Sequence, residues 1–183
     1  RAAIILTAGL NRKVDGADET LQDKILATAR GVGLRILGPN CLGLLVPGIG
    51  LNASFAHLPA LPGNIAFASQ SGAMCTAVLD WARARGIGFS HFISMGDAMD
   101  TDFGDVLDYL GSDPHTRAIL LYVESIHERR EFMSAGRAAA RNKPVLVIKA
   151  GRSSAGAQAA ASHTGALAGS DIVYDAAFRR AGM

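Results

Sequence analysis

Charged residues are scarce in this sequence. Lys, Arg, Asp and Glu together make up 19% of the 183 residues, and the formal net charge is only +2. A nucleic-acid surface is not indicated, because no run of Lys or Arg stands out. Disorder needs low hydrophobicity together with a high net charge, whereas apolar residues make up 49% of this chain. The composition predicts one large globular domain, or one and a half smaller ones, with ample material for a buried core.

Cysteines and long apolar runs are also lacking. Cys41 and Cys75 are the only two cysteines, too few for a disulfide framework or a cysteine-based metal site. We therefore expect a reducing, cytoplasmic environment. No apolar run approaches the roughly 20 residues that span a bilayer, and the first residues lack the pattern of a signal peptide. They read instead as a buried strand, so we expect further residues before Arg1.

Short apolar runs alternate with amphipathic segments along most of the chain. In the first part, strands are expected over residues 2–7 and 34–37, with a helix over 18–30 between them. Residues 42–62 are rich in Gly and Pro and show no clear period, which indicates a connector. From residue 63 the alternation becomes regular. Strands are expected over 64–68, 89–94, 118–123 and 144–149, and helices over 73–85, 103–110, 129–140 and 170–180.

This alternation is typical of right-handed crossovers and of a parallel sheet covered by helices on both faces, so the predicted fold class is α/β. In an open parallel sheet, ligands bind beyond the carboxyl ends of the strands, at a switch point in the strand order. The candidate segments at such ends are 38–43, 69–72, Glu124 and the stretch that contains His163.

The segment Ser69-Gln-Ser-Gly72 joins an expected strand to the start of a helix. Free backbone N–H groups and the positive end of the helix dipole make such a position a ready anion site. Ser71 adds a hydroxyl, and Gly72 would let a phosphate approach the backbone. An ordinary N-cap serine explains the same pattern and is by itself the commoner case.

Glu124 ends the apolar strand that begins near Ile119. Its carboxylate is either solvated at the rim of the sheet or accepts a hydrogen bond from an imidazole N–H, which would leave the other ring nitrogen nucleophilic. Asp97 and Asp100 also follow a strand and could line the same rim, although helix capping is the better explanation for them. Asp100 or Asp102 is the expected cap of the helix over 103–110. No metal site is predicted, because the spacing of the other histidines fits no ligand pattern (His57, His91, His115 and His127).

His163 lies in a stretch, residues 151–169, made almost wholly of Gly, Ala, Ser and Thr. Loops longer than about 12–15 residues without secondary structure are either functional or disordered in most cases. A neutral imidazole is a good nucleophile toward phosphorus, so His163 is a candidate carrier of a phosphoryl group. A surface histidine in a flexible loop is the alternative.

Together, and in this order, the segments resemble the alpha subunit of succinyl-CoA synthetase and the related nucleoside-diphosphate-forming acyl-CoA synthetases. The segment from Gly38 to Gly43 resembles the one that closes the CoA-binding domain of this family. Ser69-Gln-Ser-Gly72 matches the turn that receives the histidine phosphate, and Ser162-His-Thr-Gly165 matches the phosphohistidine loop. Glu124 falls where the family has a glutamate that contacts the active histidine.

The resemblance implies the C-terminal part of a Rossmann-like CoA-binding domain over residues 1–56, a linker over 57–62, and a flavodoxin-like, doubly wound ligase domain over 63–183. It implies that His163 is the nucleophile and carrier and that Glu124 orients it. Phosphate would be held by Ser71, Gly72, Ala73 and Gly165, and CoA or acetyl-CoA would lie near Gly38, Pro39 and Asn40.

The same resemblance implies partners outside these residues. ATP or ADP and Mg²⁺ would bind to an ATP-grasp domain or subunit that is not part of this sequence, and the small-molecule acid, CoA and phosphate would be the substrates. The Gly-rich loop that cradles the CoA phosphates in the family would lie before Arg1. This chain alone is therefore expected to be inactive, and the complete protein is expected to be an oligomer with no nucleic-acid or membrane partner.

A closer similarity is indicated by four further segments, Leu51-Asn-Ala-Ser-Phe55, Leu79-Asp-Trp-Ala-Arg83, Gly88-Phe-Ser-His-Phe92 and Arg141-Asn-Lys-Pro-Val145. They resemble bacterial fusions of an acetate–CoA ligase-like region with a GNAT acetyltransferase that modifies protein lysines. This implies an alternative function, a CoA- or acyl-CoA-sensing module without ligase turnover that regulates an attached acetyltransferase. A flavodoxin-like binding module without phosphate chemistry is a third possibility.

Overall fold

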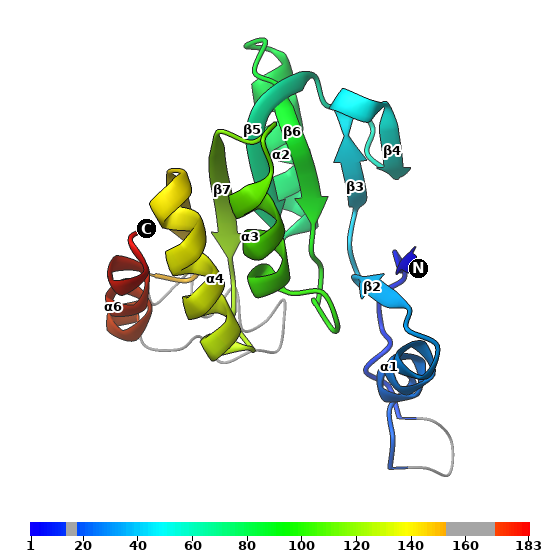
Figure 1. The fold of residues 1–183 in the computed structure, drawn as a ribbon. Coiled ribbons are helices and arrows are strands. Elements are labelled where there is room, and N and C mark those ends of the chain that lie inside the picture. The colour runs from blue at the N-terminus through cyan, green and yellow to red at the C-terminus, as the bar shows by residue number, and fades with distance from the viewer. Residues whose placement is uncertain (14–17, 153–170) are drawn as a thin grey trace.

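The computed structural model describes residues 1–13, 18–152 and 171–183 of the chain (Figure 1). The first unit consists of β1 (Ala2–Ile4), α1 (Leu21–Gly31) and β2 (Arg35–Leu37), and its two strands pair in parallel. Helix α1 begins at a capping box, in which the side chains of Thr20 and Asp23 each accept a hydrogen bond from the other residue's backbone N–H. The predicted helix and strands of this region are present, although the first strand is shorter than expected.

The larger unit is a six-stranded sheet with the order β4-β3-β6-β5-β7-β8. Four of its strands are parallel and match the strands expected from the apolar runs. They are β5 (Pro62–Ser69), β6 (Phe89–Ser94), β7 (Ala118–Val123) and β8 (Val145–Lys149). This regular part confirms the predicted α/β fold with a parallel sheet.

The other two strands correct the expectation that residues 42–62 are only a connector. β3 (Gly43–Val46) and β4 (Leu51–Ser54) form an antiparallel hairpin, joined by the short 3-10 helix η1 (Pro47–Ile49). β3 pairs antiparallel with β6 and so extends the large sheet. The hairpin was missed because its strands have only four residues each, too few to show a period against the surrounding Gly and Pro. Its residues lie within the predicted span 1–56, and the division at residue 56 stays a prediction.

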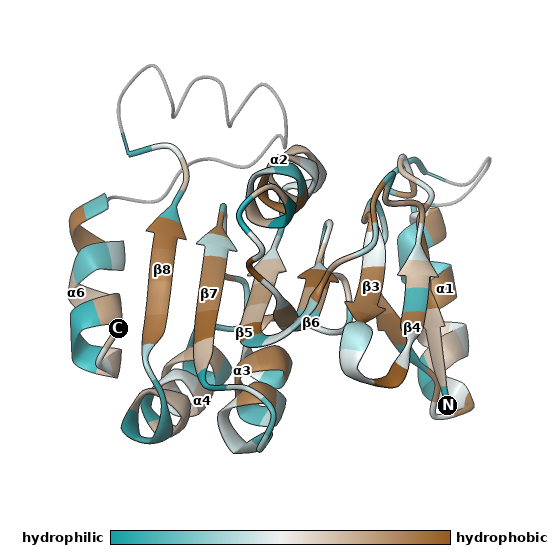
Figure 2. Ribbon diagram, turned by 90° about the horizontal axis from the view of Figure 1, so that it is seen from above, coloured by the Kyte–Doolittle hydropathy of each residue, from teal (hydrophilic) through white to brown (hydrophobic). Residues whose placement is uncertain are grey.

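Helices cover both faces of the large sheet (Figure 2). On one face lies α2 (Gly72–Arg83), whose buried residues Cys75, Leu79 and Ala82 recur at helical spacing and pack against Phe67 and Phe92 of the sheet. On the other face lie α3 (Phe103–Ser112) and α4 (Arg129–Asn142). The last described helix, α6 (Asp171–Ala181), lies beside β8.

The core is accordingly split by the sheet into two clusters. The cluster on the α3 and α4 side includes Leu107, Leu110 and Phe132, all almost fully buried. The cluster on the α2 side is built around three phenylalanine rings, and Phe92 lies 5.0 Å between ring centroids from both Phe67 and Phe89. In the described part of the chain, no helix is long and apolar enough to cross a membrane.

Candidate functional site

An open groove of about 1400 Å³ runs across the carboxyl ends of β5 and β7 and reaches the first unit. Its position follows from the topology. The chain leaves β5 toward α2 on one face of the sheet, whereas it leaves the neighbouring strands β6 and β7 toward α3 and α4 on the other face. Opposite departures of adjacent strands open a crevice at this switch point. The lining includes five of the predicted site residues, namely Asn40, Ser71, Gly72, Ala73 and Glu124.

Ser71 occupies the N-cap of α2, with its side-chain oxygen accepting a hydrogen bond from the N–H of Met74 at 3.3 Å. The N-cap explanation is therefore correct. N-capping is compatible with anion binding at the same position. The hydroxyl hydrogen of Ser71 can still be donated, and the first amides of a helix have no carbonyl partner within the helix. Gly72 and Ala73 belong to this first turn, and both residues line the groove. A Cβ added at Gly72 would meet nothing within 4 Å, so the space beside its backbone is open.

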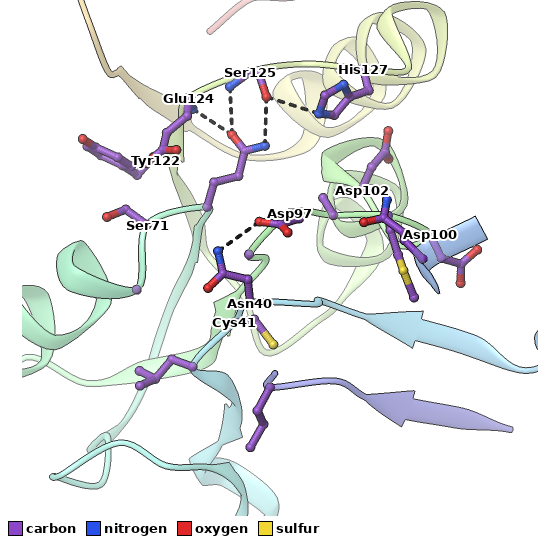
Figure 3. Close-up of a pocket in the computed structure, with 18 of the residues that line it drawn as sticks. Asn40, Cys41, Ser71, Asp97, Asp100, Asp102, Tyr122, Glu124, Ser125 and His127 are labelled. Atoms are coloured by element: carbon purple, nitrogen blue, oxygen red, sulfur yellow. Dashed lines mark hydrogen bonds between the residues drawn. The ribbon is translucent and has the colours of Figure 1, made fainter. Parts of the chain in front are cut away.

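Glu124 follows β7 directly, is half-buried, and lines the same groove as Ser71 (Figure 3). Its backbone N–H donates a hydrogen bond of 2.7 Å to the side-chain oxygen of Gln70, and the N–H of Ser125 donates to the same oxygen at 3.0 Å. The nearby Tyr122 hydroxyl has a raised pKa because it is partly buried and because Glu124 is negatively charged. The turn after β5 and the turn after β7 are thus joined by one glutamine.

Sequence reasoning missed Gln70, a residue that is only 9% exposed. It had been noted only as one member of the turn that contains Ser71. Its partners are 54 and 55 residues away in the chain, so no local pattern connects them. A polar side chain between a buried strand and an N-cap serine was the only available signal.

The segment from Gly38 to Asn40 lies below the groove and contributes only Asn40 to its lining. Gly38 and Pro39 are buried. The loop after β6 presses against this segment, and a Cβ at Gly96 would lie 2.0 Å from the carbonyl oxygen of Pro39. The side-chain N–H of Asn40 donates to Asp97 at 3.1 Å (Figure 3). These two segments therefore form one packed corner at the floor of the groove.

Helix capping is the wrong explanation for Asp97 and Asp100. The N-cap of α3 is Asp102, whose carboxylate accepts hydrogen bonds from two backbone N–H groups of the first turn. Asp97 binds Asn40 instead. Asp100 accepts a hydrogen bond of 2.7 Å from the N–H of Ile36 and another of 3.0 Å from Arg35. Asp100 thus connects the first unit to the sheet.

Three of the acidic side chains along this part of the groove, Asp100, Asp102 and Asp105, have charged or hydrogen-bonding partners. Arg35 lies 3.0 Å from Asp100 and 2.9 Å from Asp105, and the hydrogen bonds to these carboxylates raise the pKa of its guanidinium. Asp102 is satisfied by the helix amides that it caps. Asp97 and Asp100 both line the groove, so the alternative that they stand at the rim of the sheet is confirmed.

Two of the predicted site residues, His163 and Gly165, lie outside the described residues. The described part of the chain holds no group of three or more His, Cys, Asp or Glu side chains placed to bind a metal ion.

Residues 62–183 match the family of succinyl-CoA ligase-like flavodoxin domains. The ADP-forming acetate–CoA ligase I of Archaeoglobus fulgidus is 43% identical over 182 residues, which are 99% of this chain and 26% of that protein. The alpha subunit of ADP-forming acetate–CoA ligase I of Pyrococcus furiosus is 46% identical over 163 residues, 89% of this chain and 35% of that subunit.

Among solved structures, the dinucleotide-forming acetyl-CoA synthetase 1 of Ca. Korarchaeum cryptofilum, in complex with phosphate and ADP, has a TM-score of 0.90 and 40% identity. The match covers 100% of this chain and 39% of that one. This chain therefore spans between 26% and 39% of the length of these relatives.

Proposed function

The chain belongs to the family of succinyl-CoA ligase-like flavodoxin domains, within the nucleoside-diphosphate-forming acyl-CoA synthetases, and from this premise we propose that it is the phosphate-handling part of an ADP-forming acid–CoA ligase. The observation that carries the proposal is that Ser71, Gly72, Ala73 and Glu124 line one groove at the switch point of the sheet. An anion-binding helix start and a carboxylate that can orient an imidazole are the two parts that a histidine phosphoryl carrier needs.

The proposed reaction has three steps. Inorganic phosphate attacks the thioester of an acyl-CoA, so that an acyl phosphate forms and CoA leaves as the thiol. The imidazole nitrogen of His163 then attacks phosphorus, the bond between phosphorus and the acyl oxygen breaks, and the carboxylic acid leaves. Finally ADP takes the phosphoryl group from phosphohistidine, which gives ATP and restores the imidazole. A covalent carrier divides one difficult transfer into easier ones.

In the first two steps the described residues bind and orient. The Ser71 hydroxyl and the amides of Gly72 and Ala73 would donate to the phosphoryl oxygens, and the dipole of α2 would favour their negative charge. Gly165 would add a donor from the last loop. Glu124 would accept the N–H of the imidazole nitrogen that does not attack, which fixes the tautomer and makes the attacking nitrogen the basic one.

The remaining assignments are also proposals. CoA would lie against Asn40, the groove-lining residue of the segment that includes Gly38 and Pro39. ATP or ADP and Mg²⁺ would bind to an ATP-grasp domain or subunit outside residues 1–183. We also propose a division into a CoA-binding part up to residue 56 and a ligase part from residue 63, a cytoplasmic location and an oligomeric complete protein.

Phosphorylation of the complete protein tests the function. We expect the wild-type protein, incubated with ATP labelled at the γ-phosphate, to acquire label that is stable in alkali and lost in acid. His163→Ala should acquire none. His115→Ala is the matched control, because His115 is exposed and does not line the groove, and it should label like the wild type. A wild-type protein that binds acyl-CoA but takes no label would contradict the ligase function and favour the acyl-CoA sensor, with or without an attached GNAT acetyltransferase.

A further inference from the structure

The side chain of Gln70 joins the turn that contains Ser71 to the segment of Glu124. The residue is more than nine-tenths buried and stands between Ser69, the last residue of β5, and Ser71, the N-cap of α2. Its side-chain oxygen accepts the N–H groups of Glu124 and Ser125 at 2.7 Å and 3.0 Å. Its side-chain nitrogen lies 3.5 Å from the hydroxyl of Ser125.

These contacts fix the backbone of Glu124 rather than its carboxylate. A carbonyl oxygen has two lone pairs, and here both are used by consecutive N–H groups. Two consecutive amides that share one acceptor define the direction in which the chain leaves β7, and with it the direction of the Glu124 side chain. Figure 3 shows both hydrogen bonds, from Glu124 and from Ser125, converging on one point at the edge of the groove.

The fold does not need this side chain to join β5 to β7. The backbone N–H of Gln70 donates to the carbonyl oxygen of Tyr122 at 3.2 Å, and the two strands pair along their length. Removal of the side-chain amide of Gln70 would therefore leave the sheet intact, and only the turn after Val123 would lose hydrogen bonds. The Gln70 side chain is therefore not needed to hold β5 and β7 together, and its hydrogen bonds act on the turn after β7.

We propose that Gln70 is a positioning residue, which acts through Glu124 by holding the carboxylate at the correct distance from the anion site at Ser71. The inference rests on the proposed function, because Glu124 matters here as the partner of the phosphoryl-carrying histidine. The glutamine side chain is long enough to reach the segment after β7, and its carbonyl oxygen can accept two hydrogen bonds at once. A displacement of about 1 Å between reacting groups is enough to slow a reaction strongly.

A double-mutant cycle on the complete protein, with its ATP-grasp part, tests the inference. The measured quantity is the single-turnover rate at which His163 is phosphorylated from ATP, in the wild type, Gln70→Met, Glu124→Gln and the double variant. We expect Gln70→Met to slow the reaction about tenfold in the wild-type background. In the Glu124→Gln background the same change should slow it by less than about twofold, because its effect passes through the missing carboxylate. Asn142→Leu is the matched control. Asn142 also binds the backbone of another element through its side-chain amide, here by donating to the carbonyl oxygen of Gly111, but it is not in the groove.

Hydrogen exchange gives a second measurement that does not depend on turnover. In Gln70→Met the amides of Glu124 and Ser125 should exchange at least about tenfold faster, while the amides within β7 stay protected. Gln70→Glu keeps an oxygen acceptor of the same reach, so both amides should stay slow. Gln70→Ala serves in place of Gln70→Met if that variant does not fold. Slow exchange of both amides in the variant that lacks the acceptor would overturn the inference.

The outcomes separate the two claims. If the wild type is labelled and Gln70→Met is as fast as the wild type, the inference fails and the proposed function stands. If the effects of Gln70→Met and Glu124→Gln simply multiply, Gln70 does not act through Glu124 and the inference fails as well. If no variant, including the wild type, acquires label on His163, the proposed function fails and the inference falls with it.

Discussion

At the scale of single residues, removal of the Glu124 carboxylate tests whether this group orients the imidazole of His163, without a change in the fold. Glu124→Gln keeps the shape and the backbone hydrogen bond to Gln70, but a neutral amide stabilises an imidazole N–H less well than a carboxylate. We expect phosphorylation of His163 to slow about tenfold or more, with an unchanged unfolding transition, because a half-buried rim residue contributes little to stability. Rapid-quench labelling of the complete protein measures the rate. Equal rates in variant and wild type would remove Glu124 from the mechanism.

A comparison of two N-caps can separate the observed capping role of Ser71 from its proposed phosphate-binding role. Ser71→Ala should lower the free energy of unfolding by about 1 kcal/mol, because the N-cap acceptor for Met74 is lost. It should also raise the KM for phosphate about tenfold, since a hydroxyl donor to a charged group is lost. Thr20→Ala removes the N-cap of α1, outside the groove lining. It should cost similar stability without changing the KM, and a KM change of the same size in both variants would mean that Ser71 only caps.

The residues of the site were predictable from the sequence to different degrees. Ser71 and Glu124 could be found because they stand at the ends of strands that their apolar runs define. Gln70 and Asp100 could not, because their partners lie more than 50 residues away and no periodicity connects such positions. Asp97 was misread for the same reason, since its partner Asn40 belongs to another segment. Local patterns predict where a group stands but not which distant group it meets.

At the scale of elements, the loop after β6 and the segment after β2 touch through their backbones, and Gly96 makes that approach possible. Its φ is +56°, and a Cβ there would lie 2.0 Å from the Pro39 carbonyl oxygen. Gly96→Ala should therefore destabilise the protein by at least about 3 kcal/mol. Chemical denaturation of the complete protein measures the change.

Gly86 provides the matched control for this substitution. It also has a positive φ, +66°, but a Cβ at Gly86 would meet nothing within 4 Å. Gly86→Ala should lower the free energy of unfolding by only about 1–2 kcal/mol, which is the cost of placing alanine in the left-handed conformation. If both variants lose the same stability, the close approach at Gly96 contributes nothing beyond its backbone conformation.

Element prediction succeeded where a period could develop. Helix α2 buries Cys75, Leu79 and Ala82 on one side, a spacing that is visible in the sequence. The strands of the parallel core are continuous apolar runs, because helices cover both of their faces. The β3–β4 hairpin has strands of four residues each on both sides of a Gly- and Pro-containing turn. There is no room in it for a pattern to repeat, and its partner strand β6 lies far along the chain.

At the scale of the whole molecule, the groove lies at one end of the sheet and a buried polar cluster lies at the other. The cluster is centred on His91 in β6, which is 7% exposed. Its Nε2 lies 3.4 Å from the hydroxyl of Tyr109, and its Nδ1 lies 3.6 Å from a carboxylate oxygen of Asp113. Ser90 and Thr116 complete the cluster with a hydrogen bond of 2.8 Å. None of these residues lines the groove, so the cluster bears on stability rather than on the proposed chemistry.

Burial lowers the pKa of His91 below its ordinary value of 6.5, and the neighbouring charge of Asp113 offsets this only in part. The unfolded chain therefore binds a proton at a higher pH than the folded one does. The contribution of His91 to the free energy of unfolding should be fully present above pH 6.5. It should decrease as the pH falls from 6.5 through the pKa of the folded state, and the free energy should not change further on this account at lower pH. Denaturant titrations of the complete protein between about pH 5 and 8 measure the slope, and His91→Gln, which cannot be protonated, should flatten it. A variant that keeps the wild-type slope would assign the pH dependence to other groups, because a neutral amide at this place has no proton to exchange.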